Sequence, residues 1–161
     1  MYLIDGHNLI GQLPDISLKD TNDEAKLVQK LIGFSARQQK RIVVVFDSGL
    51  PGGKSRLSTA QVEVIFASVR STADDVMKER IKRVRDAGQW VVVSNDRVVL
   101  DAARARKMTT LTSAQFAPLL MPTRAAKEKR ARQQDAGEAA DVYVSPAEVE
   151  AWLKIFRAKD E

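Results

Sequence analysis

The chain has 161 residues, of which 44% are hydrophobic, and its formal net charge is +5. This length and apolar fraction predict one folded domain with a proper core and exclude a chain that is disordered throughout. There is no cysteine, which excludes disulfides and thiolate metal sites and fits a reducing cytosol. No leader pattern and no apolar run of membrane length occur, so we expect a soluble, cytoplasmic protein without a membrane span.

Hydrophobic periodicity predicts strands that alternate with helices. In chain order these are strand 2–5, helix 23–39, strand 41–47, strand 61–67, helix 72–87, strand 89–94, helix 97–107, strand 107–111 and helix 113–120. Such alternation predicts a three-layer α/β/α sandwich around a mostly parallel sheet with right-handed crossovers.

The first strand ends in a short polar stretch. Its apolar run stops at Asp5, where Gly6 would let the backbone turn sharply into a loop that continues through Pro14. Asn8 can hydrogen-bond either this loop or the neighbouring carboxylate. An ordinary strand-to-loop turn explains the same residues, so the stretch alone does not define a site.

Residues 48–58 are rich in turn formers. The sequence over 52–55 suggests a phosphate loop, but Gly49 lies one residue too close and no clear helix follows. We expect instead a mobile basic loop over the site, carrying Lys54 and Arg56.

The start of the helix over 72–87 decides which of two neighbouring acids faces outward. If Thr72 is the N-cap, Asp75 completes a capping box and Asp74 is free to face the site. If Ser71 is the cap, the two acids exchange roles. We favour Thr72, and we expect Gly88 to end the helix.

Two later helix starts show similar features. Asp96 follows the strand over 89–94, although it could simply cap the helix over 97–107. Ser113 is the expected cap of the helix over 113–120. Residues 124–140 are either a solvent-facing helix or partly disordered. A last helix, over 145–157, would begin at Pro146 and pack on the body.

Acidic residues are expected to gather at one edge of the sheet, because ligand sites form at the carboxyl ends of parallel strands. They are Asp5, Asp47, Asp74, Asp75 and Asp96. Crowded carboxylates raise one another's pKa and favour a bound cation, and hard oxygen ligands suit Mg²⁺ or Mn²⁺. Two such ions can activate water for phosphodiester cleavage. His7, the only histidine, is expected to hydrogen-bond nearby rather than to bind the metal.

Basic residues gather in stretches that the metal hypothesis would place on a phosphate backbone. The expected RNA contacts are Lys54, Arg56, Arg124, Lys127, Lys129, Arg130 and Arg132. Each run taken singly is also consistent with a solvated helix face.

Five stretches, in this order, resemble the YacP-like NYN domains of the PIN-like nuclease superfamily. They are 4–10, 44–47, 62–66, 72–75 and 94–96. The resemblance implies a PIN-like sheet over residues 1–122, with a basic segment and a C-terminal helix over 123–161 packed on the same domain. It also implies a metal-dependent endoribonuclease, and bacterial relatives are associated with cleavage of messenger RNA at the ribosome.

Position by position, the resemblance implies that Asp5, Asp74 and Asp96 are the principal catalytic and metal-binding acids. It gives Asn8 and Asp47 supporting roles and places Asp75 where relatives have a second acid. The residues expected to orient these acids are Asn8, His7, Asn95 and Thr72. Asn95 departs from the family, because relatives commonly have serine there, and this puts Asp96 in question.

Three functions are consistent with the sequence. The first is an endoribonuclease that uses Mg²⁺ or Mn²⁺ and acts on messenger RNA, as a monomer. The second is an RNA- or ribosome-binding module with weak or no nuclease activity. The third, which the basic surface disfavours, is a metal-dependent phosphatase for small molecules.

Overall fold

A computed structural model of the chain describes residues 1–47 and 53–121. The strands are β1 (Tyr2–Asp5), β2 (Ile42–Phe46), β3 (Gly53–Lys54), β4 (Val62–Phe66), β5 (Val91–Val93) and β6 (Thr109–Leu111). The helices are α1 (Gly6–Ile10), α2 (Asp23–Gln38), α3 (Ala73–Arg83), α4 (Arg97–Ala105) and α5 (Ser113–Leu120), with a 3₁₀ turn over Ala87–Gln89. In these parts of the chain, no helix is long and apolar enough to cross a membrane.

The strands form one six-stranded sheet in the order β3-β4-β2-β1-β5-β6. Five strands are parallel and β3 runs antiparallel to β4, which confirms the mostly parallel sheet. β1 lies in the middle, with Tyr2 opposite Ile42 on one side and Val91 on the other. The chain builds outward from β1 in both directions, so the switch point lies between the carboxyl ends of β1 and β5.

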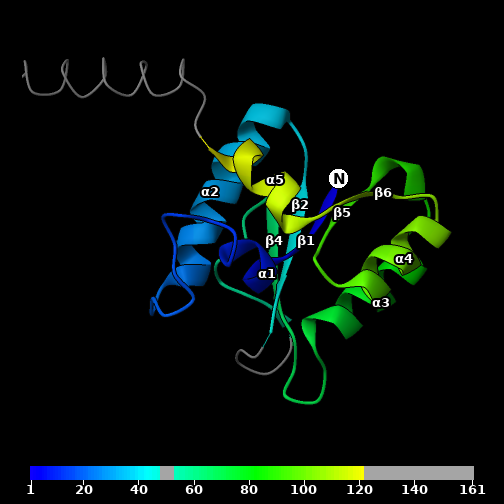
Figure 1. The fold of residues 1–161 in the computed structure, drawn as a ribbon, viewed down its shortest axis with the longest axis horizontal. Helices are drawn as coiled ribbons and strands as arrows, with labels where there is room; N and C mark the ends of the chain where they lie inside the picture. Colours follow the sequence, from blue (N-terminus) through cyan, green and yellow to red (C-terminus); the bar gives the residue numbers. More distant parts are fainter. Residues whose placement is uncertain (48–52, 122–161) are drawn as a thin grey trace, which may run out of the picture. The chain divides into compact units, whose positions relative to one another are not determined.

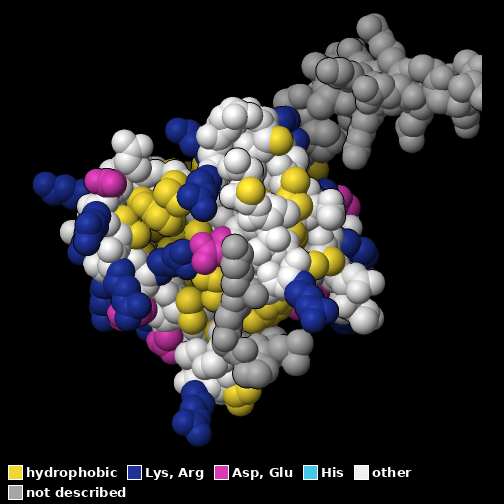
Figure 2. Space-filling view, turned by 180° about the vertical axis from the view of Figure 1, so that it is seen from behind, with side chains coloured by type: hydrophobic (Ala, Val, Ile, Leu, Met, Phe, Trp, Pro, Cys, Tyr) yellow, Lys and Arg dark blue, Asp and Glu magenta, His cyan; other side chains and the backbone are white. Residues whose placement is uncertain are grey.

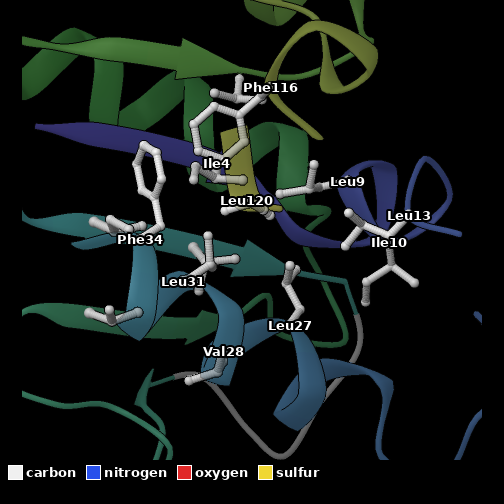
Figure 3. Packing of buried hydrophobic residues seen from close by; sticks show 14 of the residues in the cluster. Ile4, Leu9, Ile10, Leu13, Leu27, Val28, Leu31, Phe34, Phe116 and Leu120 are labelled. Atoms are coloured by element: carbon white, nitrogen blue, oxygen red, sulfur yellow. The ribbon is translucent and has the colours of Figure 1, made fainter. Parts of the chain in front are cut away.

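Both faces of the sheet are covered, because successive side chains of a strand point to opposite sides. On one face Ile4 and Val44 pack with residues of α1, α2 and α5 (Figures 1 and 3). On the other face Leu3 and Val43 pack with residues of α3 and α4. The three-layer α/β/α architecture is therefore confirmed.

Aromatic rings hold the first of these layers together. Tyr2 of β1, Phe34 of α2 and Phe116 of α5 meet with ring centroids 5.1–5.5 Å apart, two of the pairs edge to face. Figure 3 shows the Phe34 and Phe116 rings. Edge-to-face pairs add to the stabilisation that burial already gives. This cluster fixes α2 and α5 on the central strand.

The stretch after β1 differs from the prediction. Residues 6–10 form the short helix α1 rather than a loop, with Asp5 as its N-cap. Gly6 is not needed for a turn, since no glycine in the described residues has a positive φ. It is needed for space: a Cβ on Gly6 would lie 2.2 Å from Cε1 of Phe46.

The end of α3 also differs from the prediction. The helix stops at Arg83 instead of continuing to 87, and Val84 is extended. The extended backbone lets Val84 and Ala87 pack against the core beside α3, while Gly88 sits in the 3₁₀ turn and does not terminate the helix. The guanidinium of Arg106 donates to the backbone oxygens of Lys82 and Val84 at 3.1 and 2.5 Å, which satisfies carbonyls left open at the helix end.

Two smaller predictions were wrong. Thr112, not Ser113, caps α5: its hydroxyl accepts from the Gln115 N–H, and the Gln115 side chain accepts in return from the Thr112 N–H. Within the expected loop over 48–58, Gly53 and Lys54 form the edge strand β3. The expected elements over 124–140 and 145–157, and the packing of residues 123–161 on the body, lie outside the described residues.

Candidate active site

Asp5 is the most buried of the predicted acids, with a residue exposure of 3%. Its Oδ1 accepts from the Asn8 backbone N–H at 3.1 Å, and its Oδ2 accepts from the Asn8 side-chain amide. Burial raises the pKa of Asp5, the Asn8 and Ser94 hydrogen bonds oppose this rise, and the charge of Asp47 adds to it. The prediction that Asn8 binds the neighbouring carboxylate is confirmed.

Ser94 joins the ends of β1 and β5. Its fully buried hydroxyl donates to Oδ2 of Asp5 at 3.3 Å and accepts from the Asp96 N–H at 3.0 Å. Asp96 in turn caps α4 by accepting from the Val99 N–H at 3.0 Å. Ser94 was not predicted as a site residue, although a serine two residues before a strand-end aspartate was a visible signal.

Asn95 has a different partner from the one expected. Its side-chain oxygen accepts from the backbone N–H of Ser113 at 3.0 Å, which docks the start of α5 on the loop after β5. The residue before Asp96 thus anchors a neighbouring helix. The hydroxyl that binds the Asp96 backbone comes from Ser94, so the departure at Asn95 does not deprive Asp96 of a serine contact.

The predicted start of α3 is confirmed. Thr72 is the N-cap, its hydroxyl accepts from the Asp75 N–H at 3.2 Å, and the Asp75 carboxylate accepts from the Thr72 N–H at 3.3 Å. Asp47, at the end of β2, accepts from the Ala73 N–H at 2.6 Å. This bond pins the first residue of α3 to the carboxyl edge of the sheet.

Asp74 and Asp75 therefore have separate surroundings. Asp75 is exposed, and the Lys78 ammonium at 2.8 Å together with Thr72 lowers its pKa. Asp74 is half-buried, and its pKa is raised by burial first and then by the charges of Asp96, Asp5 and Asp47. We refer to these four residues, Asp5, Asp47, Asp74 and Asp96, as the acidic cluster. Asp75 instead contacts its cap residue Thr72 and the Lys78 ammonium.

The donor set of the acidic cluster is of the kind that hard divalent cations prefer. The other three negative charges of the cluster raise the pKa of Asp74, and no hydrogen bond from a described residue reaches the Asp74 carboxylate. In the described residues, however, no three Asp, Glu or His side chains already converge as a ligand set. The chemistry of the donors fits Mg²⁺ or Mn²⁺.

The remaining predicted residues are His7 and the basic ones. His7 packs its ring edge on Phe46, with centroids 5.3 Å apart, and its Nε2 lies 3.7 Å from Oε1 of Glu24. It therefore links α1 to α2. Arg56 is exposed and Lys54 is in β3, but the Lys54 side chain is outside the described residues, as are all of 124–132.

A groove of about 610 Å³ runs along α3. Its walls include Asp75, Glu79 and Arg83, with Val76 and Val84 supplying apolar surface. None of the acidic cluster lines it. The cluster is thus a site at the open sheet edge and separate from this groove.

A parallel α/β sheet with clustered carboxylates at its switch point is the arrangement of a PIN-like, nuclease-type domain. The family model for the YacP-like NYN domain matches residues 2–157, and the chain belongs to that family. The chain is 37% identical over 90 residues to "Uncharacterized protein YacP" of Bacillus subtilis, a match that covers 53% of this chain and 51% of that protein. The aligned part thus spans about half the length of this curated relative.

Solved structures show the same fold. The crystal structure of Rae1 (YacP) from Bacillus subtilis has a TM-score of 0.68 at 24% identity and covers 99% of this chain and 95% of that chain. Its W164L mutant has a TM-score of 0.60 at 21% identity, with coverages of 92% and 89%. The predictions of family and fold class are confirmed.

Proposed function

We propose that this protein is a divalent-metal-dependent endoribonuclease that hydrolyses RNA phosphodiester bonds at the acidic cluster. The observation that carries the proposal is the position of the acidic cluster at the carboxyl edge of an NYN-type sheet, where Ser94 joins the ends of β1 and β5. Burial and the neighbouring charges also raise the pKa of Asp74 there. Neighbouring carboxylates repel one another and lower the stability of the fold. Carboxylates with a shifted pKa are therefore frequent at functional sites. The NYN family consists of nuclease-type domains, which supports this choice over a small-molecule phosphatase.

In the proposed mechanism, Asp5, Asp74 and Asp96 hold Mg²⁺ or Mn²⁺, with the Asp47 charge close by. The bound ion supplies Lewis acidity at the phosphate. Asn8 and Ser94 keep the Asp5 carboxylate in one orientation through their hydrogen bonds.

The test compares cleavage of a single-stranded and a hairpin RNA in Mn²⁺ and in EDTA. Wild type should cleave only with metal, and Asp5→Asn and Asp74→Asn should abolish cleavage. Asp101→Asn is the matched control, because Asp101 is an exposed acid on α4 that pairs with Arg104 at 2.8 Å. Cleavage that survives EDTA, or that persists in both cluster variants, would contradict the mechanism.

Binding is proposed to involve RNA phosphates, which need positive charge more than fixed geometry. Lys54, Arg56 and the run over 124–132 supply that charge. Neutralising Arg124, Lys127, Lys129, Arg130 and Arg132 together should weaken RNA binding, and each lost contact should flatten the slope of log K against log salt by about 0.7. An unchanged slope would mean that the run only solvates the chain.

The second candidate is an RNA- or ribosome-binding module with weak or no cleavage. It is favoured by the absence of three converged metal ligands among the described residues. RNA or ribosome binding without cleavage in Mn²⁺ would select it. A messenger RNA substrate, action at the ribosome and a cytoplasmic location remain part of the first proposal, to be tested by ribosome co-sedimentation and by cleavage of ribosome-bound messages.

A further inference from the structure

One lysine stands beside the acidic cluster. Lys78 follows Asp74 by one turn of α3, and residues four apart lie on the same helix face. Its ammonium is 2.8 Å from Oδ1 of Asp75. Among the described groups, Lys78 is the positive charge that acts on Asp74, and it interacts with Asp96 as well.

Two of the other three cations of α3 are paired elsewhere, and the third, Lys82, lies two helical turns beyond Asp74. Arg80 makes a two-pronged bond to Glu63 of β4, at 2.8 and 3.3 Å. Arg83 pairs with Glu79 at 2.9 Å, along the same helix. Figure 2 shows how Lys and Arg side chains, with Asp and Glu among them, gather on the side of the molecule that carries α3 and α4. Within this mixed surface, Lys78 is the α3 cation next to the acids.

The bond between Lys78 and Asp75 is well placed to exchange. The Lys78 side chain is 33% exposed and the Asp75 side chain 55%, and ion pairs that are open to water contribute little to stability. Asp75 also keeps a second role without Lys78, because it accepts from the Thr72 N–H in the capping box. A stronger anion can therefore take the ammonium without unfolding the helix start.

We propose that Lys78 is the cation that positions RNA at this site: it leaves Asp75 and binds a non-bridging phosphate oxygen beside the acidic cluster. This inference rests on the proposed nuclease function. Carboxylates repel a phosphate, so an RNA strand at this edge needs a positive partner within reach of the reacting group. A lysine ammonium is a point charge that binds any phosphate, and the contact is thus independent of base identity.

The first test measures binding of a short, fluorescein-labelled, single-stranded RNA in EDTA over a range of salt concentrations. Lys78→Gln should flatten the salt slope by about 0.7, whereas Lys78→Arg should keep it. Asp75→Asn, which removes the resting partner, should tighten binding. Lys40→Gln is the matched control, because it removes one exposed positive charge near Met1, at the opposite edge of the sheet.

The second test measures cleavage in Mn²⁺. Lys78→Gln should raise KM about tenfold, the loss of one charge-assisted hydrogen bond, with a much smaller change in kcat and an unchanged melting temperature. Salt slopes that are equal in wild type and Lys78→Gln would overturn the inference, whether or not the protein cleaves. Wild type that binds RNA with a Lys78-dependent slope but never cleaves would overturn the nuclease proposal and leave this phosphate contact standing.

Discussion

Gly6→Ala is the sharpest structural test of the site. The added Cβ would lie 2.2 Å from Cε1, 2.3 Å from Cδ1 and 2.9 Å from Cζ of the Phe46 ring. That ring cannot easily move, because Phe46 is fully buried, stacks on Phe66 at 5.4 Å and has His7 against it at 5.3 Å. Either α1 or β2 has to shift.

The free energy of unfolding should fall by about 2 kcal/mol. Overpacking a buried site costs about 1–3 kcal/mol, and distances this short place Gly6 at the upper end. Alanine recovers at most about 1 kcal/mol through its better helix propensity, and less at the first residue of the five-residue helix α1. Because Asp5 is the N-cap of that helix, its carboxylate should move as well, and RNA cleavage should slow.

Urea denaturation of Gly6→Ala beside Gly88→Ala measures this effect. A Cβ on Gly88 would have no atom within 4 Å, so that control should stay within about 0.5 kcal/mol of wild type. In a Phe46→Leu background, which removes the ring, Gly6→Ala should cost less than it does alone. If Gly6→Ala is as stable as wild type, the Phe46 contact does not explain the glycine.

Three further predictions concern the site. Asp74→Asn should stabilise the metal-free protein at pH 7 in urea denaturation. The pKa of Asp74 is raised in the folded state, so the wild type loses stability as the pH rises from the unfolded pKa, about 3.9, through the folded one. The advantage of the variant should vanish below that window, and an equal gain at low pH would exclude a charge effect. Ser94→Ala should cost about 1–3 kcal/mol, since it leaves the part-buried Asp96 N–H unpaired. It should also slow cleavage, because the Asp5 carboxylate loses a hydrogen bond, and an unchanged kcat would rule out an orienting role. Thr72→Ala should lower the free energy of unfolding by about 1 kcal/mol through the lost cap. Asp75→Asn should keep more cleavage activity than Asp74→Asn, and the reverse order of activities would show that the site uses Asp75.

Features that depend on neighbours in the sequence were predictable. The Thr72 cap and its capping box match a four-residue pattern, which favoured this register but left Ser71 open as the cap until the structure decided between them. The strands ending at Asp5 and near Asp96 were visible as apolar runs, and the parallel sheet then placed both acids at one edge. Local rules were sufficient at Thr72 but not at α5, where the same pattern over Thr112 and Gln115 was present and Ser113 was predicted as the cap.

Features that depend on distant contacts were not predictable. Gly6 reads as a turn residue in the sequence, and only the position of Phe46, forty residues later, explains it as a packing residue. Ser94 gained its role from Asp5, at the far end of the described chain. The end of α3 at Arg83 reflects packing and the Arg106 contacts, which no pattern within the helix reveals.

The central position of β1 has a consequence for how the chain is made. Tyr2 leaves the ribosome before its two sheet neighbours, Ile42 and Val91, which come much later in the chain. Until β5 emerges, one edge of an apolar strand has no partner, and closing so large a loop is entropically slow. The acids at the tips of β1 and β5 can therefore meet only after β5 has emerged, so chains that stop before β5 should carry no working site.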